Sequence, residues 1–408
     1  MPTFTISRAF GDGAIWNHEG VSMHFEGYRR ANGAAGTRNY VGILSTVVCA
    51  NEVADEIARQ VGGTTAFMHQ QGCCQTPVDI ERVNQTLIGL GRNPNLSSVV
   101  LVSLGCESTA VGEVAKGISE SGKRVETIVI QEIGGAARSM AEGVLVAQDM
   151  VQEASKLKRG PCSVSDLVLG LKCGSSDTTS GLAPNPALGI TSDLVVEGGG
   201  TSILGEVTEF IGAEHLLAKH ARNQEIGRQV IDLVQRMEKR AKSVGADIRG
   251  GQPTGGNIKG GLTTIEEKSL GAIAKAGNAP IQAVYEYGVA PAVKGLVVMD
   301  SPGREPEILT GLACAGCNVI AFTTGRGAPQ GFPFVPVVKI TGNEKTWSKL
   351  RDHMDLDVSA VMRGEESLPK AGERIFQEIL AVASGRLTKA EISGYTKAMD
   401  IYVTGPVI

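Results

Sequence analysis

The sequence predicts an α/β protein in which a doubly wound, mostly parallel sheet domain is followed by a second, larger α/β domain. Three observations favour this fold class. Short β-branched and apolar runs alternate with longer segments of helical pattern from Gly27 onward. The chain has 408 residues, which is too long for one ordinary domain. A segment containing Gly and Pro, residues 156–165, is the best candidate for a linker between two such series.

These observations divide the chain into three parts. We expect an N-terminal extension over residues 1–26, a first α/β domain over 27–160 and a C-terminal α/β domain over 161–408. We also expect the active site to lie between the two α/β domains, because chemically active residues follow predicted strands in both of them.

The composition excludes several classes of function. Lys plus Arg (39) nearly balance Asp plus Glu (43), and no long basic or acidic run is present, so nucleic-acid binding is not expected. No apolar run approaches the roughly 20 residues that span a bilayer, and residues 1–26 contain no apolar core of signal-peptide length. We therefore expect a cytoplasmic protein with no membrane contact, and a homo-oligomer.

The first domain is expected to contain four strand–helix units. Apolar, β-branched runs predict strands at residues 40–48, 64–69, 98–104 and 125–130. Helical patterns follow them at 51–61, 77–91, 111–121 and 136–158, the first opened by Asn51 and the second by Thr76 and Pro77. Such repeated units predict a parallel sheet with right-handed crossovers.

Polar and thiol groups gather where these four strands end. The strand ends carry, in order, Cys49 and Asn51, His69 and Cys73, Cys106 and Glu107, and Gln131 and Glu132. Ligands of doubly wound sheets bind outside the carboxyl ends of the strands, near a switch in strand order. This edge is therefore a predicted ligand-binding edge.

The second domain repeats the same pattern with longer polar loops. A buried strand, residues 166–173, runs into the small and polar loop 174–181. A helical region from about Glu206 to Val244 precedes a Gly-rich polar stretch at 253–271 that contains Asn257 and Lys268. Strands are expected at 295–300 and 318–324, and Arg326 lies between two glycines after the second. The tail, 343–408, has the pattern of packed helices.

Eight cysteines in a chain of this length do not form a disulfide scaffold. We expect five of them to be small buried residues: Cys49, Cys74, Cys162, Cys314 and Cys317. His69, Cys73, Cys106 and Cys173 form the sharper group, because each lies at or just after the end of a predicted strand. Thiolates with imidazole suit iron, zinc or an iron–sulfur cluster. The alternative is four unrelated buried residues.

Seven segments of the chain resemble the altronate/galactarate dehydratase family. In order they are GYRRANGAAGTRNYVGIL, HQQGCCQ, NPNLSSVVLVSLGCE, LKCGSSDTTSGLAPNPALG, IGAEHLL, GNIKGGLTTIEEKSLGAIAKAG and FTTGRG, and the resemblance runs from about Gly27 to beyond Lys339. The resemblance implies a hydro-lyase that converts a sugar acid, an aldonate or aldarate, to a 2-keto-3-deoxy acid. It also implies an iron requirement, met either by Fe²⁺ or by an iron–sulfur cluster.

Two departures from that family bear on substrate and partners. Altronate dehydratases of the family often begin with a small additional domain, and we expect that this domain is either absent here or supplied by a separate small subunit. Around Cys73 the family usually has an aromatic residue where this chain has Gln71, and Cys74 is an additional thiol. A related branch resembles the large subunit of sulfolactate sulfo-lyases, which eliminate sulfite instead of water.

The resemblance and the strand ends together assign candidate roles. Cys73, Cys106 and Cys173 are the expected iron ligands, with His69 as an alternative ligand. His69, Glu107 and Lys268 are the candidates for the general base that removes the α-proton. The predicted substrate contacts are Arg326, which would bind the carboxylate beside glycine N–H groups, and Ser175, Asp177 and Asn257, which would contact hydroxyls.

Two other functions compete with the sugar-acid hydro-lyase. One is a sulfo-lyase large subunit that releases sulfite from sulfolactate. The other is a non-catalytic, metal-binding subunit that needs a small partner for activity. The product formed, and its dependence on a partner, would distinguish the three.

Overall fold

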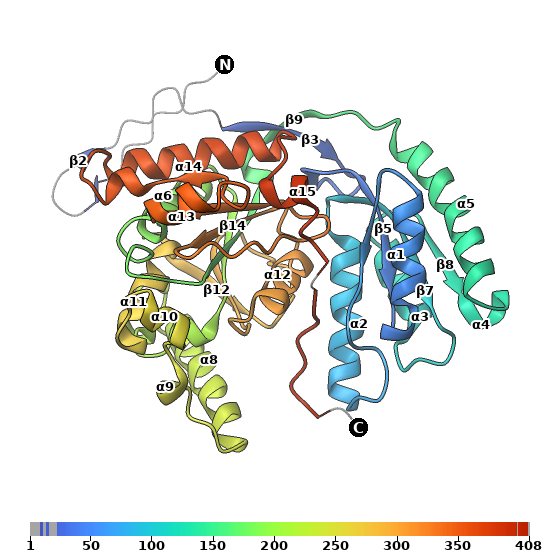
Figure 1. Cartoon of the computed structure of the whole chain (residues 1–408), viewed down its shortest axis with the longest axis horizontal. Coiled ribbons are helices and arrows are strands. Elements are labelled where there is room, and N and C mark those ends of the chain that lie inside the picture. The colour runs from blue at the N-terminus through green and yellow to red at the C-terminus, as the bar shows by residue number, and fades with distance from the viewer. Residues whose placement is uncertain (1–8, 11–13, 16–22, 398, 407–408) are drawn as a thin grey trace.

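A computed structural model of the chain describes residues 9–10, 14–15, 23–397 and 399–406. It confirms the predicted fold class, since two separate sheets, each wholly parallel, lie side by side with helices around them (Figure 1). Most of the predicted N-terminal extension lies outside the described residues. Of that extension, β1 (Ala9–Phe10) pairs with β2 (Ala14–Ile15) in a short antiparallel sheet.

The first sheet has four parallel strands in the order β6-β5-β7-β8. They are β5 (Tyr40–Ser45), β6 (Thr64–Phe67), β7 (Leu96–Ser103) and β8 (Val125–Val129). The helices between them are α1 (Asn51–Gln60), α2 (Pro77–Arg92), α3 (Val111–Ser119), α4 (Ile130–Ile133) and α5 (Ala136–Ala154). The predicted strand–helix units are therefore present, with boundaries shifted by a few residues.

Alternate residues of β7 explain why this sheet is covered on both faces. Val100 and Val102 pack in one core with α1 and α5. Val99 and Leu101 point the other way, into a core with α2 and α3. Strand order reverses beside β5, which lies between β6 and β7. The carboxyl ends of β5 and β7 thus form the topological switch point of the first domain.

The second sheet has seven parallel strands in the order β12-β13-β11-β10-β14-β15-β16. Their bounds are β10 (Val168–Gly174), β11 (Thr201–Leu204), β12 (Ile281–Tyr285), β13 (Gly295–Met299), β14 (Val319–Thr324), β15 (Val337–Thr341) and β16 (Leu356–Asp357). The first strand in sequence, β10, lies at the centre between β11 and β14. Here too strand order reverses, and the switch point lies between β10 and β14.

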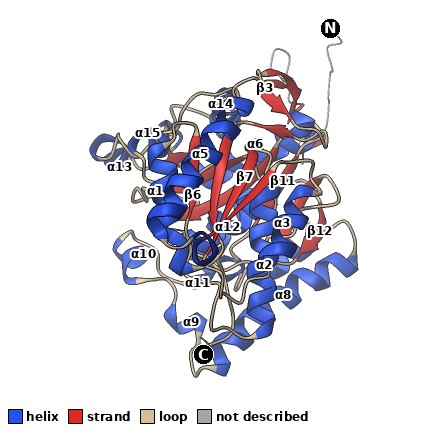
Figure 2. Ribbon diagram, turned by 90° about the vertical axis from the view of Figure 1, so that its right-hand side faces the viewer, coloured by secondary structure: helices blue, strands red, loops and turns tan. Residues whose placement is uncertain are grey.

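Helices cover both faces of the second sheet (Figure 2). Those of this domain are α6 (Pro184–Glu197), α7 (Glu214–Lys219), α8 (Gln224–Ser243), α9 (Ile248–Gly251), α10 (Gly255–Lys259), α11 (Ile265–Ile273), α12 (Glu305–Cys314), α13 (Glu344–Lys349), α14 (Leu368–Ala383) and α15 (Lys389–Ser393). The α6 and α14 helices pack together on one face, and α12 covers the other. None of the described helices is long and apolar enough to cross a membrane.

The predicted linker, residues 156–165, is not a free connection. It contains β9 (Gly160–Ser163), which pairs antiparallel with β3 (His24–Arg29), and β3 in turn pairs with β4 (Ala35–Gly36). Strand β3 also crosses the predicted boundary between residues 26 and 27. Backbone pairing with the start of the first domain thus holds the connecting segment in place.

The two sheets share one apolar core, because α2 and α12 pack against each other between them. Gly89 of α2 marks their close approach: a Cβ there would lie 2.8 Å from the carbonyl oxygen of Cys314. Cys314 and Cys317 are buried in this core, as expected from the sequence. The pair therefore packs between domains.

We predict that Gly89→Ala destabilises the protein, because the added methyl group must displace backbone at the α2–α12 contact. Overpacking of this kind typically costs about 1–3 kcal/mol. Gly112→Ala in α3 is the matched control, since nothing lies within 4 Å of its Cβ position, and alanine is the better helix former. Thermal unfolding of the two variants measures the difference. Equal melting temperatures would contradict the tight interdomain contact.

Candidate active site

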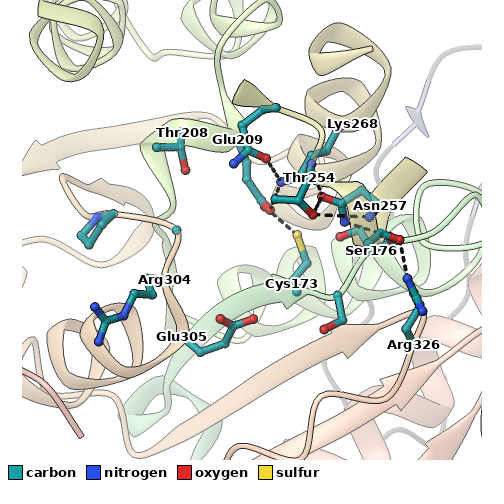
Figure 3. A pocket seen from close by; sticks show the side chains of 16 residues that line it. Cys173, Ser176, Thr208, Glu209, Thr254, Asn257, Lys268, Arg304, Glu305 and Arg326 are labelled. Atoms are coloured by element: carbon teal, nitrogen blue, oxygen red, sulfur yellow. Dashed lines mark hydrogen bonds and ion pairs between the residues drawn. The ribbon is translucent and has the colours of Figure 1, made fainter. Parts of the chain in front are cut away.

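A pocket of about 740 Å³ opens at the switch point between β10 and β14 (Figure 3). Its lining residues are Cys173, Gly174, Ser175, Ser176, Thr208, Glu209, Gln252, Thr254, Gly256, Asn257, Lys268, Pro302, Gly303, Arg304, Glu305 and Arg326. All of them belong to the C-terminal domain, so residues of the first domain do not line this pocket. Of the predicted site residues, it brings together Cys173, Ser175, Asn257, Lys268 and Arg326.

The loop that follows β10 forms the floor of the pocket. Ser175 has a left-handed backbone (φ 48°), which is uncommon outside glycine and typical of constrained functional loops. Its carbonyl oxygen accepts a hydrogen bond from the backbone N–H of Arg326 at 3.0 Å. The two loops at the switch point are therefore fixed to each other.

Asp177, predicted to contact a substrate hydroxyl, is engaged with protein groups. Its side chain is buried, and Oδ1 accepts hydrogen bonds from the backbone and hydroxyl of Thr179 at 3.0 and 2.6 Å. Oδ2 accepts from Nδ2 of Asn343 at 2.7 Å. Both oxygens hold the loop, and Asp177 does not line the large pocket. The structure therefore makes it a loop-organising residue.

Asn257 lines the pocket but is also engaged with protein groups. Its Oδ1 caps α10 by accepting from the backbone and hydroxyl of Thr254 at 3.1 and 2.8 Å. Its Nδ2 donates to the carbonyl of Ser176 at 3.0 Å. Asn257 thus joins the 253–271 segment to the loop after β10 and shapes the wall between them.

Arginines stand on two sides of the cavity (Figure 3). Arg326 is exposed and donates from Nη1 to the carbonyl of Gly256 at 2.5 Å. Arg304 pairs with Glu307 at 3.2 Å and with Asp400. Because a guanidinium carries five N–H donors, the single bond from Arg326 to Gly256 leaves this residue well suited to bind an anion.

Buried charges surround Cys173 behind the pocket. Glu206, left-handed at φ 69°, accepts from Lys172 Nζ at 2.5 Å and from the backbone N–H of Cys173 at 2.9 Å. Lys275 Nζ lies 3.1 Å from Glu206 Oε2 and 3.3 Å from Glu209 Oε2. These lysines and glutamates are almost fully buried, so each charge depends on its partners.

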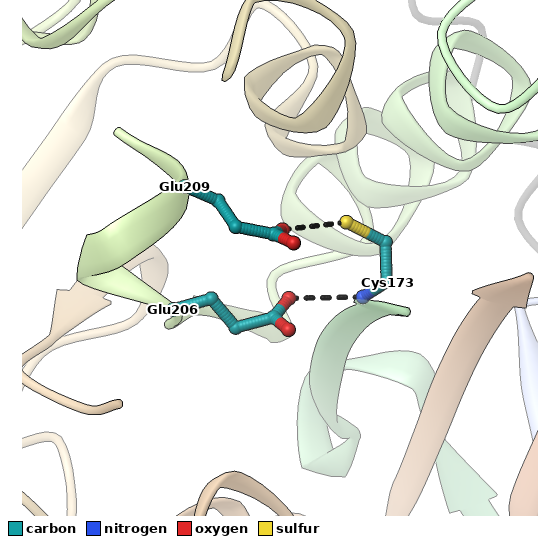
Figure 4. Close-up of side chains that lie close together, drawn as sticks. All are labelled: Cys173, Glu206 and Glu209. Carbon is teal, nitrogen blue, oxygen red and sulfur yellow. Dashed lines mark hydrogen bonds between the residues drawn. The ribbon is translucent and has the colours of Figure 1, made fainter. Parts of the chain in front are cut away.

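Cys173 is held as a neutral thiol by this network. Its Sγ donates to Glu209 Oε2 at 2.7 Å (Figure 4). Burial raises the pKa of the Cys173 thiol, and the negative charge of Glu209 raises it further. Burial also opposes ionisation of Glu209, but the ammonium groups of Lys275, Lys268 and Lys172 outweigh it and lower the Glu209 pKa. The thiol therefore bonds to a carboxylate that remains charged.

The three donors Cys173, Glu206 and Glu209 lie within 4.8 Å of one another, the spacing of a metal site. Lys275 Nζ, however, lies 3.1 Å from Cys173 Sγ and contacts both carboxylates, so an ammonium already occupies the cationic position. Burial lowers the Lys275 pKa, but the carboxylates of Glu206 and Glu209 and the hydrogen bond to the Cys173 sulfur raise it by a larger amount. This donor set therefore does not fit an iron ion as it stands.

The structure does not gather the three cysteines predicted as iron ligands. Cys73 and Cys106 are exposed on loops of the first domain, whereas Cys173 is buried in the second. Within the described chain, the one group of three donors at metal-ligand spacing contains only Cys173 of the three. Cys49 and Cys74 are exposed as well, so the expectation that they are buried is wrong.

His69 and Glu107 also lie away from the pocket. The buried ring of His69 contacts the Ser45 carbonyl through Nε2 at 2.9 Å and accepts from the Gln71 N–H through Nδ1 at 3.1 Å. Burial lowers its pKa to about 4. Glu107 accepts from Thr46 Oγ1 at 2.6 Å and the Gly105 N–H at 2.7 Å. Of the three predicted bases, only Lys268 lines the pocket.

Sequence reasoning missed the glutamates and Lys275. Glu206 and Glu209 directly follow β11, a four-residue strand that the preceding glycines concealed. Recognising that strand would have placed both carboxylates at the same sheet edge as Cys173. Lys275 lies in the 3-10 turn after α11 (Ala274–Ala276), where its apolar neighbours indicate burial but not a partner.

Two family models match the chain. The model described as D-galactarate/altronate dehydratase, C-terminal, covers residues 164–405, and the model described as D-galactarate dehydratase/altronate hydrolase, second domain, covers residues 27–155. The (2R)-sulfolactate sulfo-lyase subunit beta of Chromohalobacter salexigens is 39% identical over 375 residues, which cover 91% of this chain and 95% of that protein.

Two dehydratases are similar over a smaller part of their own length. The altronate dehydratase of Bacillus subtilis is 33% identical over 392 residues, covering 93% of this chain and 78% of that protein. The galactarate dehydratase (L-threo-forming) of Escherichia coli is 34% identical over 407 residues, covering 94% of this chain and 77% of that protein. Each match therefore spans both sheets described above.

We predict that stability falls as the pH is lowered from 6.5 to 4, partly because of His69. Between these values the unfolded chain protonates this residue and the folded chain, whose His69 pKa is about 4, does not. At pH 4.5 the contribution is about 2.5 kcal/mol. Urea unfolding at pH 7 and 4.5 should show a smaller pH-dependent loss in His69→Gln than in the unmodified chain. Equal losses would contradict burial of a neutral imidazole.

We also predict that Lys275→Met destabilises the fold by about 3–5 kcal/mol, because it leaves two buried carboxylates without their shared ammonium. The double variant Lys275→Met/Glu209→Gln should recover part of the loss by removing one of those charges. Lys349→Met, at an exposed position of α13, is the control for loss of a lysine. Unfolding free energies from urea titration measure all three. A Lys275→Met variant as stable as the control would refute the network.

Proposed function

Because the chain belongs to the D-galactarate/altronate dehydratase family, we propose that it is a lyase that dehydrates a sugar acid in the pocket between β10 and β14. The substrate would be an aldonate or aldarate, and the product a 2-keto-3-deoxy acid. The observation that carries the proposal is the lining of this pocket, in which two exposed arginines and one lysine accompany several hydroxyl and amide side chains.

A carboxylate would bind at Arg326. Its guanidinium forms paired hydrogen bonds with carboxylates in a fixed geometry. Ser175 also lines the pocket, on the loop whose Ser175 carbonyl accepts a hydrogen bond from the Arg326 backbone N–H. The remaining hydroxyls of a sugar acid would meet Ser176, Thr208 and Thr254, and such a site rejects smaller acids by leaving polar groups unpaired.

We assign proton transfer at the α-carbon to Lys268, which as a base must first give up the ammonium proton that it carries beside Glu209. Its Nζ donates to Gln252 Oε1 at 2.9 Å and lies 3.7 Å from Glu209 Oε1, and the side chain reaches the cavity. A positioned base or acid of this kind typically contributes about 10²–10⁴-fold to the rate. Glu209 acts as a positioning residue, because it holds Lys268 on one side and the Cys173 thiol on the other.

Release of sulfite from sulfolactate is the second candidate function. The 39% identity to the sulfo-lyase subunit beta, over 95% of that protein, supports it. Elimination would again remove an α-proton, but the group leaving the β-carbon would be an anion. Arg304, on the other side of the cavity from Arg326, would then attract the sulfonate (Figure 3). The same relative supports the proposal that a second, small subunit joins this chain.

The test is a screen of aldonates, aldarates and sulfolactate with anaerobically purified protein, with and without added ferrous iron. We expect a 2-keto-3-deoxy acid from one or more sugar acids. Pyruvate and sulfite from sulfolactate alone would establish the second candidate. Binding of acids without turnover, until a small subunit is added, would identify a subunit that is inactive alone.

We predict that Lys268→Gln lowers kcat on the accepted acid by about 10²-fold or more, with little change in KM, because proton transfer is lost while carboxylate binding remains. Lys259→Gln is the matched control, since Lys259 is exposed on α10 and outside the pocket lining. Unchanged melting temperatures would show that both variants fold. Retention of full activity by Lys268→Gln would remove Lys268 from the mechanism.

A further inference from the structure

The two arginines of the pocket differ in the groups that they already bind. Arg326 donates to the carbonyl of Gly256 and forms no ion pair with a carboxylate of the described residues. Arg304 instead pairs with two carboxylates, with Glu307 at 3.2 Å through Nε and with Asp400 through Nη2. The pocket is therefore open to an anion at Arg326, whereas the charge of Arg304 is already neutralised.

We propose that Asp400 is a specificity-determining residue, which makes the pocket select acids with one anionic group and reject acids with a second one. This inference rests on the proposed binding of a carboxylate at Arg326. The accepted acid would direct its carboxylate to Arg326 and a neutral, hydroxylated end to Arg304. A second carboxylate, or a sulfonate, would have to compete with Asp400 for the Arg304 guanidinium.

Carboxylates outnumber cations on this side of the pocket. Glu305 and Glu307 both lie in the first turn of α12, directly after Arg304, and Glu305 lines the pocket. Figure 3 shows Glu305 beside Arg304. With Asp400, three carboxylates lie around one guanidinium, so a further anion meets net negative charge. Juxtaposition of like charges is a general means by which a binding site rejects a wrong ligand.

The segment that carries Asp400 is fixed to the first domain. The next residue, Ile401, is buried and donates its N–H to Gln70 Oε1 at 3.1 Å. Further along, the Gly405 N–H donates at 2.8 Å to Asp79, a buried residue in the first turn of α2. Asp400 is therefore presented to Arg304 by backbone that other bonds hold in place.

Tyr402 fixes the same segment to both domains. The guanidinium of Arg82, from α2, lies 5.5 Å from the centre of its ring, and that of Arg240, from α8, lies at 5.8 Å. Arg240 also donates to the phenol oxygen, and the ring packs edge-on against Tyr287 at 5.4 Å. Cation–π contacts of this kind are stabilising. A carboxylate on so constrained a segment acts as a fixed charge of the pocket rim.

The test compares two probes that lack a β-hydroxyl and therefore bind without being dehydrated. One is 2-hydroxyadipate, a dianion, and the other is its 6-amide, which has nearly the same shape and one charge fewer. Calorimetric titration of the full chain gives both dissociation constants. We expect the unmodified chain to bind the amide more tightly. Asp400→Asn removes the charge and keeps the shape, so it should shift the ratio of the two constants about tenfold toward the diacid.

Two further variants separate the charge of Asp400 from its structural contacts. Asp400→Glu keeps the carboxylate and should keep the ratio of the unmodified chain. Asp352→Asn removes a carboxylate that is 78% exposed and outside the pocket lining, and it should also leave the ratio unchanged. A salt series needs no variant. The preference for the amide should decline between about 10 mM and 1 M salt, because the Debye length falls from roughly 30 Å to 3 Å.

Three results would each overturn the proposal: diacid binding by the unmodified chain at least as tight as amide binding, an unchanged ratio in Asp400→Asn, or a ratio independent of salt. An unmodified chain that binds neither probe would overturn it as well, together with the carboxylate site at Arg326. Because neither readout is turnover, a chain that shows the expected ratios but dehydrates no sugar acid would contradict the proposed lyase and support the role of Asp400.

Discussion

Pairing of buried charges at the ends of β10 and β11 is the constraint on which the site depends. Glu206 and Glu209 are withdrawn from water, and either carboxylate would be costly to bury without the lysines around it. Lys172 comes from β10 itself, Lys268 from α11 and Lys275 from the turn after it. These ion pairs therefore bring three separate segments together at the carboxyl end of β10. They also place Cys173 opposite Glu209.

The same topological rule operates in both domains and gives two different edges. In each sheet the first strand in sequence lies between later ones, so loops diverge at its carboxyl end and leave room for a ligand. In the second domain long polar loops fill that room with arginine, lysine and hydroxyl groups. In the first domain short loops, tied to one another by backbone hydrogen bonds, present thiols. One fold principle thus supplies two chemically distinct sheet edges.

The sequence predicted strands and their polar ends well, because both depend on local pattern. It could not predict which ends meet. Lys172 stands in an apolar run and has its partner 34 residues later, just after a strand too short to recognise. Asp177 lies in a loop whose composition is typical of a substrate-binding loop. Its Oδ2, however, accepts a hydrogen bond from Nδ2 of Asn343, far along the chain. Cys49 was predicted to be buried, but it lies in the turn before α1 and is exposed. These outcomes depend on tertiary pairing, which residue types alone do not specify.

The C-terminal segment physically connects the two edges. Asp400 pairs with Arg304 at the rim of the large pocket. The next residue, Ile401, donates its N–H to Gln70 Oε1 at 3.1 Å and accepts from Gln71 Nε2 at 3.4 Å, in the loop that continues into Cys73. Gln71, which stands where the family usually has an aromatic residue, thus contacts this segment through its amide. Two consecutive residues therefore join the arginine at the rim of the pocket in one domain to the Cys73 loop of the other, so a shift of this segment would move both.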